Sequence, residues 1–136
     1  MHFKPSLAVL LLAASLILPS ALFAADTTPP TGTIVISKDK PYTNTASVTL
    51  KLSARDTGSG ISQMSFSSDN INWSTPARYS TSKKWTLSQG DGTKTVYAKF
   101  SDKPGNWSIA YSDSITLDTQ GPSITVTSPK EGEVIR

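Results

Sequence analysis

The sequence predicts an all-β protein, an antiparallel β-sandwich of about seven strands, on three observations. Short runs rich in β-branched and aromatic residues recur at intervals of about ten residues. Clusters of Gly, Pro, Asn and Asp separate these runs, as expected of turns. After residue 25, no segment has the apolar period of an amphipathic helix. Together these patterns are typical of two packed antiparallel sheets.

The two strongest strand predictions are residues 46–54 and 93–101. In both, apolar and polar side chains alternate, which is the pattern of a strand with one buried face. The core residues expected on these strands are Val48, Leu50, Leu52, Ala54, Val96, Ala98 and Phe100. These two strands therefore define the expected core.

Shorter patterns predict the other elements. Strands are expected at residues 33–37, 62–68, 83–87 and 108–118, and they would bury Met64, Phe66, Trp85, Leu87, Ile115 and Leu117. A two-residue hairpin turn is expected at Asp69-Asn70. Other turns and irregular segments are expected at residues 38–44, 56–60, 74–80, 88–92 and 104–106.

Residues 1–25 have the three parts of a secretory signal peptide. A basic start with Lys4 precedes an apolar run from Leu7 to Leu18, and small residues follow Pro19. The run is shorter than the ~20 residues that a membrane-spanning helix needs. We therefore expect cleavage after residue 24 or 25 and a secreted or cell-surface protein, with the periplasm as an alternative and no membrane insertion after cleavage.

Composition excludes several chemistries. The chain has no cysteine, so it has no disulfide, no thiol nucleophile and no thiolate metal site. Its one histidine, His2, lies in the predicted leader. Without an imidazole, the Ser-His-Asp and Cys-His arrangements are unavailable to the mature protein. Glycoside hydrolysis by paired carboxylates needs no histidine, but the acids of this small domain lie in predicted turns.

The charge is slight and spread along the chain. Of the 13 basic residues only Lys4 lies in the leader, so the remainder has two more basic than acidic residues. This balance argues against nucleic acid or an anionic membrane as a partner. The lysines are interpreted as solvated strand faces that discourage pairing with other chains.

A repeated linker predicts a second domain. Residues 118–126 resemble residues 26–34, since both begin Asp-Thr, continue to a Pro and enter a β-branched run. We therefore expect a domain at 26–118, followed over 119–136 by a linker and the first strand of a second, truncated domain. The alternative is that 119–136 is a frayed tail.

Five short motifs resemble the Ig-like, fibronectin type III-like repeats found in tandem in exported bacterial proteins. They are Asp26 to Pro30, Ser47 to Leu50, Asp56 to Trp73 with its Gly-Ser-Gly turn, Gly90 to Tyr97, and Asp102 to Asn106. The resemblance covers residues 26–118 and implies a Greek-key sandwich of Ig-like topology. Such repeats are mostly spacers or adhesive modules, so it implies adjacent Ig-like domains, surface proteins or glycans as partners.

Oxygen ligands could converge on a calcium ion at one end of the sandwich. The candidate ligands are Asp56, Asp102, Asn106 and Asp118, with Asp26 in the other linker as a further carboxylate. The alternative is that Asp56 and Asp102 accept backbone N–H bonds within their own Gly-rich turns. No other cofactor is expected.

Aromatic residues are numerous for a small domain. Trp73, Tyr79, Trp107 and Tyr111 are candidates for stacking on sugar rings, and the alternative is that they fill the core. The sequence therefore predicts a non-catalytic structural or adhesive module that acts as a spacer or protein-binding repeat. The alternative is a carbohydrate-binding accessory module of a secreted polysaccharide-active enzyme.

Overall fold

The structure is a computed structural model that describes residues 24–122. The predicted leader and the predicted second domain lie almost wholly outside these residues. The described chain forms eight strands: β1 (Thr31–Ile36), β2 (Tyr42–Thr43), β3 (Ser47–Arg55), β4 (Ile61–Ser67), β5 (Ala77–Arg78), β6 (Ser82–Thr86), β7 (Gly92–Asp102) and β8 (Tyr111–Leu117). A short turn, η1 (Ser37–Asp39), follows β1. No helix in this part of the chain is long and apolar enough to cross a membrane.

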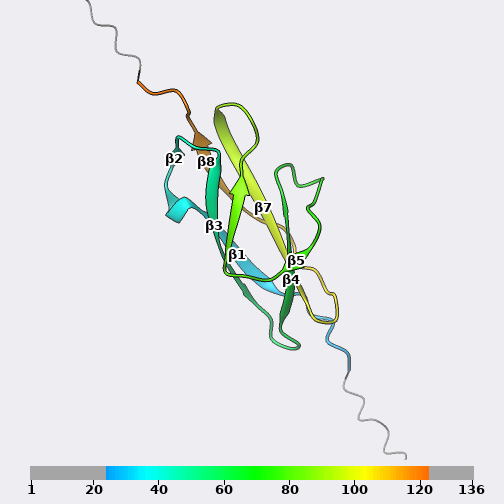
Figure 1. Cartoon of the computed structure of the whole chain (residues 1–136). Helices are drawn as coiled ribbons and strands as arrows, with labels where there is room; N and C mark the ends of the chain where they lie inside the picture. The colour runs from blue at the N-terminus through cyan, green and yellow to red at the C-terminus, as the bar shows by residue number, and fades with distance from the viewer. Residues whose placement is uncertain (1–23, 123–136) are drawn as a thin grey trace, which may run out of the picture.

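The strands form two packed sheets, which confirms the predicted all-β, Ig-like sandwich (Figure 1). The first sheet has the order β1-β3-β6 and the second has the order β2-β8-β7-β4-β5. All neighbouring strands are antiparallel except β2 and β8, which are parallel. The chain crosses between the sheets after β1, β2, β3, β5 and β6.

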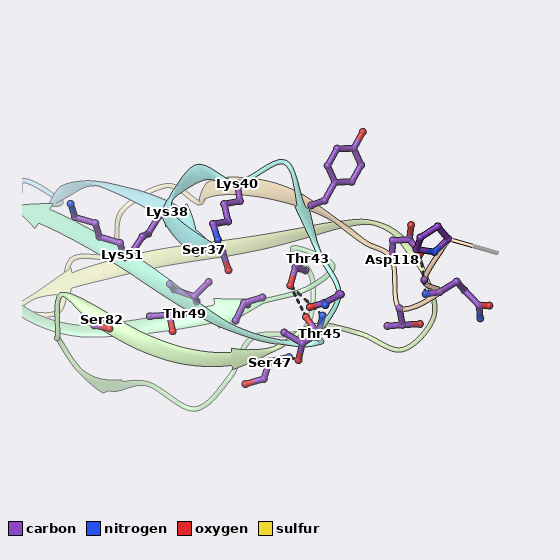
Figure 2. Close-up of a pocket in the computed structure, with 18 of the residues that line it drawn as sticks. Ser37, Lys38, Lys40, Thr43, Thr45, Ser47, Thr49, Lys51, Ser82 and Asp118 are labelled. Atoms are coloured by element: carbon purple, nitrogen blue, oxygen red, sulfur yellow. Dashed lines mark hydrogen bonds between the residues drawn. The ribbon is translucent and has the colours of Figure 1, made fainter. Parts of the chain in front are cut away.

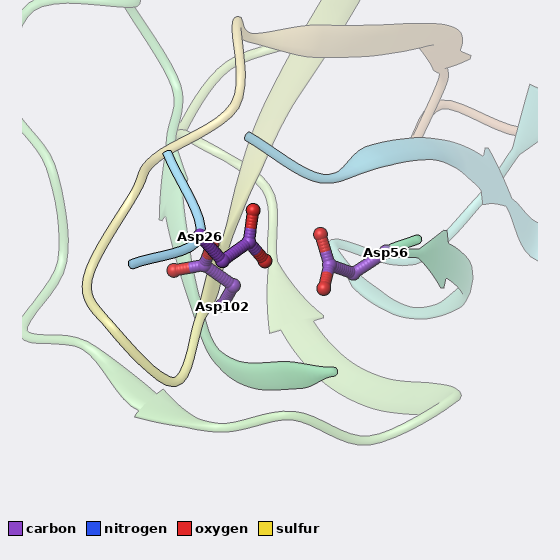
Figure 3. Close-up of side chains that lie close together, drawn as sticks. All are labelled: Asp26, Asp56 and Asp102. Atoms are coloured by element: carbon purple, nitrogen blue, oxygen red, sulfur yellow. The ribbon is translucent and has the colours of Figure 1, made fainter. Parts of the chain in front are cut away.

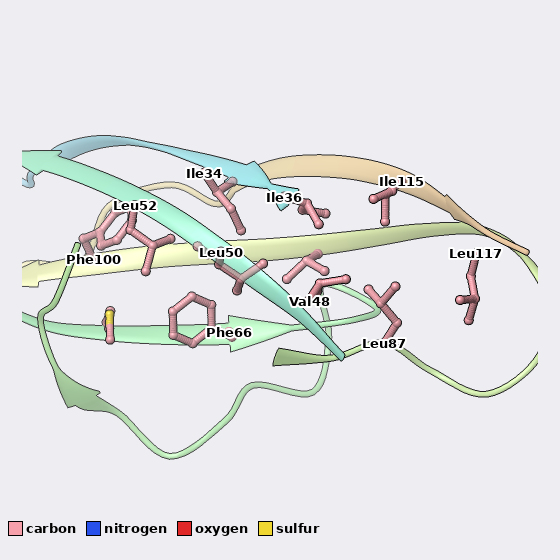
Figure 4. Packing of buried hydrophobic residues seen from close by; sticks show 13 residues of the cluster. Ile34, Ile36, Val48, Leu50, Leu52, Phe66, Leu87, Phe100, Ile115 and Leu117 are labelled. Atoms are coloured by element: carbon pink, nitrogen blue, oxygen red, sulfur yellow. The ribbon is translucent and has the colours of Figure 1, made fainter. Parts of the chain in front are cut away.

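The alternating pattern of β3 explains how the first sheet packs. Its even-numbered residues Val48, Leu50 and Leu52 are almost fully buried, whereas the odd-numbered residues from Ser47 to Arg55 are exposed. This is the consequence of a period of two on a sheet with one solvated face. The core predicted from the sequence is confirmed at Val48, Leu50, Leu52, Met64, Phe66, Leu87, Val96, Ala98, Phe100, Ile115 and Leu117 (Figure 4). Ala54 and Trp85 are only partly buried against it.

Three local predictions are wrong. The segment predicted as a turn over 38–44 contains β2, and the segment predicted as irregular over 74–80 contains β5. Both strands have only two residues, too few for an alternating pattern to show. The predicted strand over 108–118 begins only at residue 111, because Ser108 is held in the preceding loop by its N–H bond to the carbonyl of Phe100.

The predicted hairpin at Asp69-Asn70 is also wrong. Asp69 accepts the N–H groups of Ile71 and Asn72 at 2.8 and 2.7 Å, and this closes a compact loop instead of a two-residue turn. Asn70 has a φ of 60°, which an Asn tolerates better than most residues.

The two linkers leave the sandwich at opposite ends (Figure 1). The N-terminal linker enters beside the loop that follows β3 and the loop that follows β7. The C-terminal linker leaves directly after β8 and lies beside the segment around Thr43. The two linkers are therefore separated by the length of the domain.

Candidate functional site

Three aspartates meet where the N-terminal linker enters the sandwich (Figure 3). Asp26 lies in the linker, Asp56 follows β3 and Asp102 ends β7. One carboxylate oxygen from each lies within 4.8 Å of the other two. Asp102 is buried, and Asp26 and Asp56 are partly exposed.

Asp56 organises the Gly-rich loop after β3. Its Oδ2 accepts the N–H groups of Gly58 at 3.1 Å and Gly60 at 2.7 Å. These are the turn hydrogen bonds that the sequence suggested for this residue. Its other oxygen, Oδ1, is buried and has no hydrogen-bond partner among the described residues.

Asp102 organises the loop after β7. Its Oδ1 accepts the N–H groups of Gly105 and Asn106 at 2.9 and 2.7 Å, and its Oδ2 accepts Nδ2 of Asn106 at 2.6 Å. This buried carboxylate therefore has a donor for each oxygen, which is what a buried charge requires.

Asp26 fastens the linker to the loop that Asp56 shapes. Its Oδ1 accepts the N–H of Thr28 at 3.0 Å, and its Oδ2 accepts both the N–H and the hydroxyl of Ser59 at 3.0 and 2.9 Å. These bonds, from Thr28 first and then from Ser59, hold the pKa of Asp26 below its ordinary value. The amide of Asn106 adds a bond to the backbone oxygen of Asp26 at 2.8 Å, so the linker is held by two loops.

The structure brings together three of the four predicted calcium ligands and separates the fourth. Asp56, Asp102 and Asn106 lie together, whereas Asp118 lies at the opposite end, where its N–H donates to the carbonyl of Thr43 at 2.9 Å. Asp26 takes the fourth place. The sequence placed Asp26 and Asp118 in equivalent linkers, and only the topology shows which linker meets these loops.

Two of the predicted aromatic contact residues lie together on the second sheet. The ammonium group of Lys99 on β7 lies 4.3 Å from the ring centre of Trp73 and 5.2 Å from that of Trp107. Both indoles therefore engage the same cation.

A repeated motif places these two tryptophans. Residues 66–74 and 100–108 both read Phe-Ser, four variable residues, then Asn-Trp-Ser. In each copy, the Phe N–H donates to the final Ser Oγ at 3.0 Å, and the Ser N–H donates to the Phe carbonyl at 2.8 Å. This internal repeat is present in the sequence, but the sequence analysis did not predict its structural role.

The two predicted tyrosines pack against the core. The ring of Tyr79 lies edge-on to that of Phe100 at 6.0 Å, and its hydroxyl accepts the N–H of Ala54 at 3.0 Å. The ring of Tyr111 lies 6.3 Å from that of Phe100 on another side. Both contacts stabilise the sandwich, and a role in sugar binding stays a prediction for all four aromatic residues.

A groove of about 1040 Å³ lies at the other end of the domain (Figure 2). Its walls are η1, the segment around β2, the outward side of β3 and the C-terminal linker. Hydroxyl and lysine side chains dominate its lining, among them Ser37, Lys38, Lys40, Thr43, Thr45, Ser47, Thr49, Lys51 and Ser82. The sequence did not predict this groove.

Comparison with solved structures supports the fold. The chain is similar to the PKD1 domain of Vibrio anguillarum Epp, with a TM-score of 0.50 and 14% identity over 70% of this chain and 100% of that chain. It is similar to the PKD1 domain of the Vibrio cholerae metalloprotease PrtV, with a TM-score of 0.50 and 17% identity over 68% of this chain and 100% of that chain.

A third similar structure contains fibronectin(III)-like modules of Clostridium thermocellum CbhA. Its TM-score is 0.52 and its identity is 14% over 72% of this chain and 53% of that chain. No protein-family profile and no curated protein sequence matches. Identities this low establish the fold and nothing further, and the fold is that of bacterial PKD and fibronectin(III)-like domains of Ig-like topology.

Proposed function

We propose that this domain is a non-catalytic structural or adhesive module of an exported bacterial protein, which sets the distance between its neighbours. The observation that carries the proposal is the exit of the two linkers from opposite ends of one rigid sandwich (Figure 1). A module connected in this way transmits its full length to the chain. The signal-like residues 1–25 support export, and the similar fold of modules from larger proteins supports a place in a longer chain.

The linkers themselves support a serial arrangement. Oδ1 of Asp26 accepts the N–H of Thr28 at 3.0 Å, and Oδ1 of Asp118 accepts the N–H of Gln120 at 3.1 Å. The two Asp-Thr linkers therefore form the same local turn, as a repeated junction would require. This supports the proposal that a linker and a second module follow the domain of residues 26–118.

Fluorophores at the two ends test the spacer role. With dyes attached at residues 27 and 122 of the mature protein, we expect low transfer efficiency that stays constant until the domain unfolds. High transfer efficiency in the native protein would contradict a spacer. A screen of the same protein against polysaccharides and peptides should show no turnover.

We also propose that the aspartate cluster binds calcium and thereby stiffens the N-terminal junction. Calcium takes six to eight oxygen ligands, and the cluster offers three carboxylates, one of which has a buried oxygen without a partner. The proposed protein ligands are Asp26, Asp56 and Asp102, and Asn106 holds two of them through its Nδ2, which donates to the carbonyl of Asp26 and to Oδ2 of Asp102.

A thermal melt with and without calcium tests this site. We expect the melting temperature to rise with calcium but not with equal magnesium, and Asp56→Asn should abolish the rise. Asp118→Asn, at the other end of the domain, is the matched control and should leave it intact. An unchanged melting temperature in the wild-type protein would restrict the cluster to its role as hydrogen-bond acceptor.

A carbohydrate-binding accessory module is the second candidate function, favoured by the Trp73 and Trp107 pair around Lys99. Tryptophan fluorescence that responds to a neutral polysaccharide in the wild-type protein, but not in Trp107→Ala, would support it.

A further inference from the structure

The outward face of the β1-β3-β6 sheet carries hydroxyl groups and cations. Its outward positions are alternate residues of the three strands, which the register places side by side, and all of them are exposed except the partly buried Val35. They are Thr31, Thr33, Val35, Ser47, Thr49, Lys51, Ser53, Arg55, Ser82, Lys84 and Thr86. No carboxylate and no aromatic ring lies among these eleven side chains.

The register places three cations of the sheet face along neighbouring strands. Lys84 lies opposite Thr49, and its ammonium group donates to the Thr49 hydroxyl at 3.1 Å, which holds the chain across the sheet. Lys51 is two residues further along β3, a diagonal neighbour at ~7–8 Å between Cα atoms. Arg55 is four residues beyond Lys51, ~13 Å along the strand. Lys84, Lys51 and Arg55 therefore follow one another along the sheet face, with Ser and Thr hydroxyl groups between them.

The groove continues this surface past the end of β1. Lys38 and Lys40 line it together with Lys51 and Thr49, which belong to the sheet face (Figure 2). Asp118 is the one acidic residue in the lining. The face and the groove together form one basic, hydroxyl-rich surface, which we call the basic face.

Most carboxylates of the described chain are engaged elsewhere. Asp26, Asp56 and Asp102 cluster at the end of the domain opposite the groove, where Asp56 directly follows Arg55. Asp69 is bound within its own loop, and Oδ2 of Asp113 accepts the N–H of Ile36 at 2.7 Å. The small net charge of the chain therefore conceals a surface on which cations outnumber carboxylates, because only Asp118 in the groove lining and Asp39 in η1 oppose its lysines and Arg55.

We propose that the basic face binds an anionic polysaccharide. The cations complement a chain that carries carboxylate or sulfate groups at intervals, and the hydroxyl groups can donate to and accept from the sugar hydroxyls between them. The sheet face has no aromatic ring and the groove has one, Tyr42, which is too few for the successive base stacking that single-stranded nucleic acid binding uses. Apart from Tyr42 and Pro122 in the groove, its apolar side chains are the partly exposed Val35 and the core residues Val48 and Leu50, so it offers little to a lipid interior. This inference does not rest on the spacer role and uses a different sheet from the tryptophan pair.

Binding of polygalacturonate to the mature protein tests the proposal, with neutral dextran as the comparison. The test variant is Lys51→Ser/Arg55→Ser/Lys84→Ser. The matched control, Arg78→Ser/Lys94→Ser/Lys103→Ser, removes the same charge from the second sheet and the loops. Circular dichroism confirms that both variants fold, and Lys84→Ser alone serves if the triple variant does not.

We expect saturable binding of polygalacturonate that weakens as salt is raised, and no binding of dextran. The test variant should bind at least tenfold more weakly, and the control should bind within about twofold of wild type. Equal losses in both variants would attribute binding to net charge and overturn the proposal. So would an absence of wild-type binding, or equal binding of single-stranded DNA or of vesicles containing phosphatidylserine.

Discussion

Substitution of Asp102 by Ala should destabilise the domain more than any other removal of a single carboxylate. Asp102 is 1% exposed and accepts three hydrogen bonds, two from backbone N–H groups of Gly105 and Asn106 and one from the Asn106 side chain. Hydrogen bonds to a charged group contribute ~1.5–3 kcal/mol each, and part of this is offset because the buried charge is removed as well. We expect a loss of about 2–4 kcal/mol in the free energy of unfolding.

Urea denaturation followed by tryptophan fluorescence measures this loss. Trp85 is a suitable reporter because its ring lies 5.6 Å from that of the core residue Phe66. For a domain of this size, ~2 kcal/mol corresponds to a fall of at least ~8 °C in melting temperature. Asp102→Asn keeps one acceptor oxygen and should lose about half as much.

Asp91→Ala is the matched control. Asp91 is exposed, and among residues 24–122 its side chain accepts from Thr119 alone, at 3.1 Å from the Thr119 N–H and 2.8 Å from its hydroxyl. We expect its loss to cost under about 1 kcal/mol. If Asp102→Ala were within ~0.5 kcal/mol of wild type, the reasoning that this carboxylate organises the loop after β7 would be refuted.

Three further predictions concern packing, pH and backbone strain. Gly32→Ala should lower the free energy of unfolding by about 1–3 kcal/mol in urea denaturation, because a Cβ at residue 32 would lie 2.5 Å from the ring of Phe100. A stability equal to that of the wild type would show that this ring can move aside. Hydrogen bonds from the side chain and the N–H of Asn72 lower the pKa of Asp69 below its ordinary 3.8, so the stability that the Asp69 carboxylate contributes is present above about pH 4 and is lost as the pH falls. Between pH 5 and 2, the melting temperature should therefore fall less steeply for Asp69→Asn than for the wild type. Lys38 has a φ of 57°, so Lys38→Gly should raise the free energy of unfolding by up to ~1 kcal/mol, and a lower value would show that this turn is unstrained.

The sequence was sufficient for the sandwich because its core strands are long and their apolar residues alternate with polar ones. β3 buries every second residue from Val48 to Leu52 and β7 does so from Val96 to Phe100, so the period alone identified these core residues, although Ser101 and Asp102 at the end of β7 are buried as well. β2 and β5 have two residues each and depend on long-range pairing with β8 and β4, which no local pattern records. The strands that the sequence did not predict are therefore those whose structure depends on distant partners.

The candidate sites were harder to predict because each joins residues far apart in the chain. Asp26 reaches Ser59 and Asn106 across 33 and 80 residues, and the sequence could not distinguish it from Asp118. The basic face was missed because its lysines are scattered in sequence and converge only through the β1-β3-β6 pairing. The alternating pattern of β3 showed which of its residues face outward, but it did not show that β1 and β6 lie beside them.

The linker bonds determine how stiff a chain of such modules would be. Asp118 follows the last residue of β8 directly, so a second module that began there would start within one residue of the first sandwich. In such a second module, Asp118 would bind a loop as Asp26 binds Ser59 in the first module. Both modules would then hold the junction between them. On the first side, Asp91 already holds Thr119 by two hydrogen bonds. Rigid junctions, rather than long flexible linkers, would then set the spacing, and this is the arrangement that a spacer needs to transmit length.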